Sequence, residues 1–335
     1  MAISMMKGRS PFLLFLLVLG ILNVLVLFLQ IIKGDFPIPV AEALKAIAGG
    51  GSERFDLVVN RFRFPRALVA FLAGAGLALS GAILQGVTRN PLASPGVLGL
   101  NSGAALVTVS CTVLFPSIPV ALLPLAAFAG AFAAGLLSYL LAWRRGLSPV
   151  RLVLVGVGIA ASAGAIVSFL LTFSDLTQAK RAVIWMSGSV YGRSWEHFWP
   201  MLPWQVGAVV IVLLLARRLD VLQLGDPIAA GLGMRLERTR ALLLVVAVAS
   251  AGAAVAMAGT ISFVGLMAPH LARYMVGSRS IRMVPVAILT GGLLVNTADL
   301  LGRTLVTPLE IPCGILIAVI GAPYMIYLLF KKRNQ

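Results

Sequence analysis

Charged residues and cysteines are scarce in this sequence. Asp, Glu, Lys and Arg make up only 11% of its 335 residues, and just 11 residues are acidic. Soluble proteins carry about 25% charged residues, so the composition excludes an ordinary water-exposed surface. The two cysteines, Cys111 and Cys313, lie inside apolar segments, without metal-ligand spacing or a nearby histidine. We therefore expect two buried thiols and no cysteine metal site.

Motifs for nucleotides, metals and ion relays are also missing. No G-x-x-x-x-G-K-[ST] loop occurs, so the chain does not hold nucleotide phosphates in that way. His197 and His270 are 73 residues apart and lack a carboxylate cluster, which gives little support to a metal site. We predict no catalytic residue, no resident cofactor and no metal.

Acidic residues are missing from the middle of the apolar segments, where a proton or sodium relay needs them. Only Asp299 and Glu310 come close, and they flank a short turn that contains Arg303. The four-residue spacing of Asp299 and Arg303 predicts an ion pair between them. The lack of buried acid argues against transport driven by an ion gradient.

Apolar residues are abundant. They form 60% of the chain, and the mean hydropathy is +1.01. The 27 Lys and Arg residues, which give a net charge of +16, lie between apolar runs as topology signals do, rather than on one nucleic-acid-binding face. The sequence predicts an all-α polytopic membrane protein of about ten spans. We place these spans at 11–32, 65–87, 96–114, 118–142, 151–173, 199–216, 239–258, 260–276, 283–301 and 312–330.

The basic residues predict the orientation. With an even number of spans both termini share one side, and cytoplasmic termini put 17 Lys and Arg inside, including Lys7 and Arg145, against 10 outside. This excess favours cytoplasmic termini. The apolar run Phe12–Ile32 is longer than a signal-peptide core and has no small-residue cleavage site, so we interpret it as an uncleaved first helix.

Small residues in the segment 61–103 predict a membrane helix that faces protein more than lipid. Its apolar run carries five of them, which allow another helix to approach closely: Gly74, Gly76, Ser80, Gly81 and Gly86. Shifting the chain by 178 residues aligns this run with a second one around 251–277. The two runs form a faint internal repeat. Internal repeats are common in transporters, where the pathway lies between the two repeated halves of the chain.

Three segments outside the spans are long enough to have a role. Residues 33–63 and 174–199 are predicted outside, and the second is rich in aromatic residues, which favours an interfacial belt or contact with a partner or substrate. Residues 217–240 are predicted inside. There Asp226-Pro227 predicts a short helix with Asp226 as N-cap. Its few apolar residues suit contact with another protein.

Four stretches together resemble one known family. They are the run 63–99, which contains R-N-P-L-A-S-P-G, the run 259–274 with F-V-G-L-M-A-P-H, A-D-L-L-G-R at 298–303, and E-I-P-C-G at 310–314. Nearly the whole chain looks like the FecCD family, the permease subunits of ATP-binding-cassette importers for ferric siderophores, haem and vitamin B12. The resemblance implies a dimer of ten-helix permeases, identical or homologous, with two cytoplasmic ATPase subunits and an external binding protein.

The resemblance gives the inner segment a role. L-G-D-P-I-A-A-G-L-G at 224–233 is similar to the coupling helices that seat in a groove of the ATPase, within a coupling segment at 219–236; a solvated loop is the alternative. The residues implied in coupling are Leu224, Gly225, Asp226, Pro227, Ala229, Ala230, Gly231 and Gly233.

The resemblance also assigns the outer arginines and a gate. Arg63, Arg66 and Arg303 match arginines that contact acidic residues of the binding protein, since guanidinium groups steer an acidic partner; snorkelling to lipid phosphates is the alternative. The cytoplasmic gate is expected in two halves, with fewer hydroxyl groups in the second than some relatives carry. The gate residues are Asn90, Leu92, Ser148 and Pro149.

The expected pathway runs along the fifth predicted span. The small residues that we expect to line it are Gly156, Gly158, Ser162, Gly164 and Ser168. The sequence therefore predicts a single permease domain, 1–335, in a bacterial cytoplasmic membrane, passing a ferric siderophore of hydroxamate, catecholate or citrate type. A haem or cobalamin importer of the same family is the alternative. An ion-coupled transporter and a structural membrane protein are readings from other classes.

Overall fold

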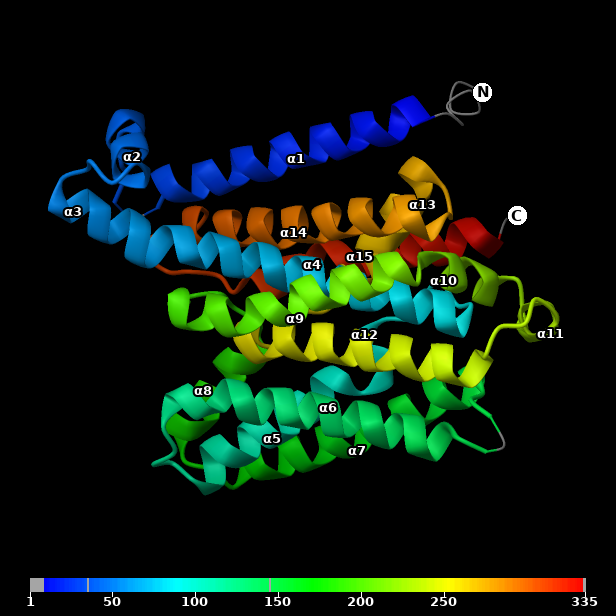
Figure 1. Ribbon diagram of the computed structural model, residues 1–335. Helices are drawn as coiled ribbons and strands as arrows, with labels where there is room; N and C mark the ends of the chain where they lie inside the picture. Colours follow the sequence, from blue (N-terminus) through cyan, green and yellow to red (C-terminus); the bar gives the residue numbers. More distant parts are fainter. Residues whose placement is uncertain (1–8, 35, 145, 334–335) are drawn as a thin grey trace.

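The computed structural model describes residues 9–34, 36–144 and 146–333, and every regular element in these ranges is a helix (Figure 1). Lys7 and Arg145, which were counted on the cytoplasmic side, lie outside the described residues. The α-helices are α1 (Arg9–Ile32), α2 (Val40–Ile47), α3 (Glu53–Asp56), α4 (Phe64–Thr88), α5 (Leu100–Leu114), α6 (Leu123–Ala142), α7 (Pro149–Thr172), α8 (Leu176–Met186), α9 (Trp195–Leu214), α10 (Ala216–Gln223), α11 (Asp226–Gly231), α12 (Leu236–Ala258), α13 (Val264–Val276), α14 (Ser280–Thr304) and α15 (Cys313–Arg333). A π-helix, η1 (Leu57–Arg63), leads into α4, and short 3-10 turns precede α5 and α6.

Each predicted span falls on a helix, and the chain is a multi-pass membrane protein. Within the described residues, seven helices are long and apolar enough to cross a bilayer. These are α1, α4 with its preceding turns, α6, α7, α9, α12 and α14, whereas α5, α13 and the apolar part of α15 are shorter. The count of ten spans stays a prediction.

Two predicted spans begin later than expected. The span at 96–114 begins at Leu100, because Pro95–Leu98 forms a 3-10 turn that ends on Gly99 in the left-handed region. The span at 260–276 begins at Val264. Gly259 and Phe263 both have positive φ, so the chain between α12 and α13 is an irregular link rather than a single break at Gly259.

Helices α4 and α12 form the centre of the bundle, and most of their residues are buried. The small residues of α4 explain this position. A Cβ on Gly74 would collide with the carbonyl of Gly291 in α14, and one on Gly81 would collide with the carbonyl of Gly265 in α13. Such close backbone approach requires glycine. The prediction that this helix faces protein more than lipid is confirmed.

Helix α1 lies along the outside of the bundle against α14 (Figure 1). Two buried amides attach it. Asn23 Nδ2 donates to the carbonyl of Leu289 at 3.1 Å, and Gln30 Nε2 donates to the carbonyl of Asn296 at 2.7 Å. Interhelical hydrogen bonds of this kind stabilise helix association where no water competes.

The segment 174–199 is more structured than predicted. It contains α8, and α9 begins at Trp195 rather than at residue 199. Trp195 donates its Nε1 hydrogen to the carbonyl of Asn60 at 2.8 Å and packs edge-on against Phe64. This aromatic ring therefore fixes the start of α4, whereas Trp199 remains exposed.

The two ends of the bundle differ in what they carry (Figure 1). One end holds α11, the start of α1 and the end of α15, and we call it the α11 end. The other holds α2, α3 and α8, and we call it the α2 end. Helix α4 begins at the α2 end and finishes at the α11 end, so it passes between the predicted docking arginines and the predicted gate.

Candidate functional site

Arg66 lies in a buried ionic cluster at the α2 end. Its Nη2 atom is 2.7 Å from Asp299 Oδ1 and 2.8 Å from Glu310 Oε2, and its Nε and Nη1 donate to the same two carboxylates. Only 9% of the residue is exposed. Its fork of donors is filled from within the chain, as suits a planar guanidinium between two acids.

Arg63 and Arg303 are buried beside this cluster. Arg63 donates to the carbonyls of Ile31 and Phe36, and Arg303 donates to the carbonyl of Gln30. All three predicted docking arginines are thus brought to one end of the bundle, below the surface. The prediction that Asp299 pairs with Arg303 was wrong, because the Asp299 carboxylate binds Arg66.

The two predicted halves of the gate meet at one cavity at the α11 end. It has a volume of about 190 Å³. Asn90 lines it from the turn after α4, and Pro149 from the first turn of α7. The rest of the lining is Thr88, Val150, Val153 and Leu154. The structure thus places together two segments that are about sixty residues apart in the sequence.

The polar gate side chains hold local turns. Asn90 Oδ1 accepts from the backbone nitrogen of Leu92 at 2.9 Å, which closes a turn of the kind asparagine favours. Ser148 is the N-cap of α7, with its hydroxyl 3.5 Å from the backbone nitrogen of Arg151. Leu92 and Ser148 are partly buried and do not line the cavity. Their side chains shape the two segments.

The segment 224–233 forms a short helix, as predicted, that projects from the α11 end (Figure 1). Its start differs by one residue, because Gly225 is the N-cap and Asp226 is the first helical residue. Gly225 adopts a φ of 106°, which suits glycine. The Asp226 carboxylate pairs with Arg240, at 2.5 Å, and with Arg89, at 3.4 Å.

The apolar side chains around α11 divide into two sets. Ala229 is fully buried against the bundle. Leu224, Ile228 and Leu232 are 59%, 52% and 65% exposed. These three residues, which we call the α11 apolar face, lie outside the core of the described chain.

Most of the predicted pathway residues lie on the exposed side of α7. They are Gly158, Ser162, Gly164 and Ser168. Gly156 is different: it is buried, and a Cβ there would collide with the carbonyl of Val97. This residue therefore packs α7 against the turn before α5.

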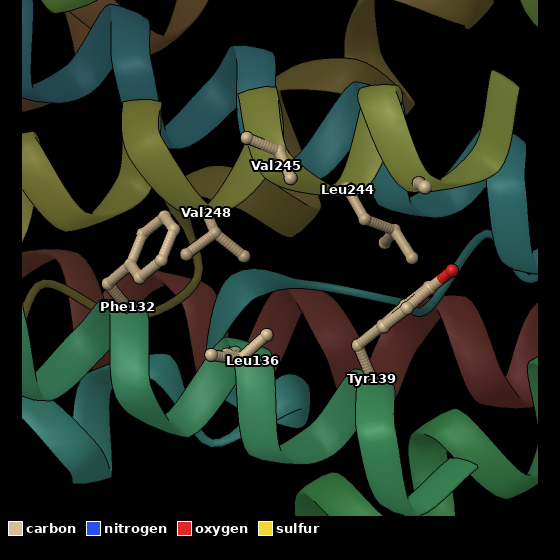
Figure 2. A pocket seen from close by; sticks show the side chains of 8 residues that line it. Phe132, Leu136, Tyr139, Leu244, Val245 and Val248 are labelled. Atoms are coloured by element: carbon tan, nitrogen blue, oxygen red, sulfur yellow. The ribbon is translucent and has the colours of Figure 1, made fainter. Parts of the chain in front are cut away.

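A separate apolar cavity of about 130 Å³ lies between α6 and α12. Figure 2 shows Phe132, Leu136 and Tyr139 of α6 pointing toward Leu244 and Val248 of α12. Sites for small molecules have volumes of about 300–1,000 Å³ and a few converging polar groups. This crevice is too small and too apolar for a metal chelate. Among the described residues, no three His, Cys, Asp or Glu side chains gather as metal ligands.

Two sequence relatives match almost the whole chain. The siderophore transport system permease protein YfhA of Bacillus subtilis is 43% identical over 98% of this chain and 97% of its own length. The iron(3+)-hydroxamate import system permease protein FhuG of the same organism is 41% identical over 98% of this chain and 99% of its own length.

A solved structure has the same fold. It is an inward-facing conformation of a metal-chelate type ABC transporter, with a TM-score of 0.84 and 30% sequence identity over 96% of this chain and 99% of that one. The sequence pattern of the FecCD transport family covers residues 21–331. These matches show that the protein belongs to the FecCD transport family.

Proposed function

We propose that this chain is the permease subunit of an ATP-binding-cassette importer that moves a ferric siderophore across the bacterial cytoplasmic membrane. Two permeases, identical or homologous, enclose the pathway. Two ATPase subunits bind the α11 end, and a binding protein delivers the chelate at the α2 end. The named activities of the relatives support the cargo, and haem or cobalamin is the alternative within the family.

The α11 apolar face carries this proposal. Exposed Leu224, Ile228 and Leu232 would be solvated in an isolated subunit, and burying a leucine or isoleucine side chain contributes about 1.5–3 kcal/mol. A groove in an ATPase subunit covers them. Binding of a helix in a groove uses a few apolar anchors. Here Ile228 lies on α11, and Leu224 and Leu232 flank its two ends.

The charge at the α11 end supports a cytoplasmic orientation. Four arginines line one cavity of about 540 Å³ between α10 and α12: Arg217, Arg218, Arg235 and Arg238. Clustered arginine beside membrane helices is typical of the cytoplasmic side. With ten spans, both termini then lie in the cytoplasm, at the end where Figure 1 shows the start of α1 and the end of α15.

The exposed side of α7 supports a dimer around a central pathway. Gly158, Ser162, Gly164 and Ser168 are small or hydroxylated. A second permease facing this side would enclose a surface without strong binding groups. A bulky chelate needs such a lining, because tight binding would slow its release.

The buried arginines at the α2 end shape the surface on which the binding protein docks. Arg66 and its neighbours fix the ends of α4 and α14, whereas Arg54 and Arg61 are exposed at the same end. We infer that the exposed pair meets acidic side chains of the binding protein, and that Arg63, Arg66 and Arg303 hold the surface in shape.

An ion gradient is not favoured as the energy source. A relay needs a carboxylate that can exchange its ion. Asp299 and Glu310, the two candidates from the sequence, are both bound to Arg66. ATP hydrolysis in the partner subunits is the energy source that we propose.

The test replaces one residue of the α11 apolar face. Ile228→Glu puts a charge where the ATPase groove is expected, so the permease should still fold but lose its copurifying ATPase and its ligand-stimulated ATP hydrolysis in lipid. Leu44→Glu is the matched control for folding and ATPase copurification, because Leu44 is an exposed apolar residue of another short helix, α2, outside the predicted spans. Unchanged ATPase binding by Ile228→Glu would overturn the proposed role of α11.

A further inference from the structure

Arg240 lies at the junction of three functional segments. It belongs to the first turns of α12, yet only 2% of it is exposed. Its Nη2 atom is 2.5 Å from Asp226 Oδ1 in α11, and its Nη1 atom donates to the carbonyl of Leu147 at 3.3 Å. One planar guanidinium thus binds the coupling helix on one side and the chain before α7 on the other.

Glu237 completes the hold on Leu147. It lies one turn before Arg240 on the same helix, with Oε1 3.7 Å from Arg240 Nη1. Its other oxygen, Oε2, accepts from the backbone nitrogen of Leu147 at 3.2 Å. Both backbone polar groups of Leu147 are therefore bound by α12 side chains. Leu147 directly precedes Ser148 and Pro149, the second half of the gate.

Asp226 reaches the first half of the gate through Arg89. The Arg89 Nη2 atom is 3.4 Å from Asp226 Oδ1. Arg89 ends α4 with a φ of 54°, a conformation uncommon for residues other than glycine. The next residue is Asn90. A single carboxylate in α11 is thus tied to both segments that line the gate cavity.

We propose that Arg240, with Asp226, is a positioning residue that transmits movement of α11 to both halves of the gate. This inference rests on the proposed function. It names the connection, from Asp226 through Arg89 to Asn90, and from Asp226 through Arg240 and Glu237 to Leu147. We call these residues the relay.

Burial gives the relay its stiffness. Separating a buried guanidinium from its closest carboxylate costs far more than the loss of an exposed pair. Glu237, 3.7 Å from Arg240, replaces only part of that interaction. When the ATPase shifts α11, Arg240 therefore follows Asp226 and draws Leu147 with it. The exposed Arg89 pair adds a second, softer connection.

The substitution Arg240→Lys separates this role from a structural one. It keeps the positive charge beside Asp226 but cannot bind two partners in the fixed fork geometry of arginine. We expect Arg240→Lys to fold and to assemble with its ATPase. This variant should lose the hydrogen bond from residue 240 to the carbonyl of Leu147.

The experiment measures coupling in the assembled transporter. Permease, ATPase and binding protein are reconstituted in proteoliposomes, and ferric-chelate uptake is divided by ATP hydrolysed. We expect Arg240→Lys to keep ATP hydrolysis and to lower this ratio about tenfold or more, within the range of typical coupling between sites. Arg238→Lys is the matched control, because it lies on the same helix, is exposed and is outside the relay.

The outcomes are distinguishable. If the wild type hydrolyses no ATP in response to the loaded binding protein, the proposed function fails. If the wild type is coupled and Arg240→Lys keeps the wild-type ratio, the relay is wrong. Should Arg240→Lys fail to assemble, Asp226→Asn decides, since Asp226 is partly exposed: a lowered ratio supports the relay, and an unchanged ratio overturns it.

Discussion

The two ends of the bundle carry ionic clusters of similar composition and different placement. At the α2 end, Arg66 joins Asp299 and Glu310 between α4 and α14, which pack together along the centre of the bundle. At the α11 end, Asp226 lies between Arg89 and Arg240 on a helix that projects from the bundle. We infer that the same chemistry holds a rigid junction at the α2 end and a movable one at the α11 end.

The difference lies in what surrounds the charges. Asp299 and Arg66 are nearly inaccessible, and the helices around them cannot separate without exposing a buried core. Asp226 is partly exposed, and little apolar surface holds α11 besides Ala229. We therefore expect stability to depend on the Arg66 cluster and transmission to depend on the Asp226 cluster. Four predictions test this contrast.

The largest effect is expected at Arg66. Arg66→Met should leave Asp299 buried without its hydrogen-bonded counter-charge and lower the free energy of unfolding by about 3–5 kcal/mol. The measurement is denaturant-induced unfolding in mixed micelles. Arg61→Met is the control, since this exposed arginine of η1 should change stability by less than about 0.5 kcal/mol. Equal stabilities for the two variants would contradict the contrast.

Glu310 should contribute less than Arg66. It is the more exposed partner, and Glu310→Gln keeps an oxygen that can accept from Arg66 while Asp299 still balances the charge. We expect the free energy of unfolding to fall by about 1 kcal/mol, in the same assay. A loss as large as that of Arg66→Met would mean that Asp299 alone does not satisfy the guanidinium.

Arg89 should affect transmission without affecting stability. In Arg89→Gln only a half-exposed pair is lost, and such pairs contribute about 0–1 kcal/mol. We expect unchanged unfolding and a several-fold fall in chelate uptake per ATP, smaller than that of Arg240→Lys. A fall in stability with an unchanged uptake ratio would reverse the roles of the two ends.

Salt should produce the smallest effect. Raising ionic strength from 0.1 to 1 M shortens the Debye length from about 10 Å to about 3 Å. This change weakens the exposed Arg89–Asp226 pair and leaves the buried Arg66 cluster almost unchanged. Uptake per ATP should fall modestly with salt in the wild type and less in Arg89→Gln. The prediction fails if both show the same salt dependence.

The sequence predicted the helices well, because each apolar run is a local signal. The small residues of α4, such as Gly74 and Gly81, predicted that it packs against other helices. Close helix packing requires small residues, and these can be recognised within one segment of sequence. The Asp226-Pro227 pair predicted a short helix for the same local reason. The start of α13 at Val264 was missed, because hydropathy does not respond to the positive φ of Phe263.

The partners of the charged residues could not be predicted. Asp299 and Glu310 are 233 and 244 residues from Arg66 in the sequence, so only the tertiary fold pairs them. Arg240 was counted as one more cytoplasmic topology signal beside Arg235 and Arg238. One local signal was present: Arg240 precedes the buried residues Leu243 and Ala247 by three and seven positions, a helical spacing.

The most direct test of the account is uptake of a ferric siderophore by proteoliposomes that contain the permease dimer and the loaded binding protein. Vesicles with the ATPase subunits are compared with vesicles that lack them. Each kind is tested once with ATP inside and once with an imposed proton or sodium gradient. We predict accumulation only with ATPase and ATP, and no effect of the gradients. Accumulation driven by an ion gradient without the ATPase would contradict the central claim.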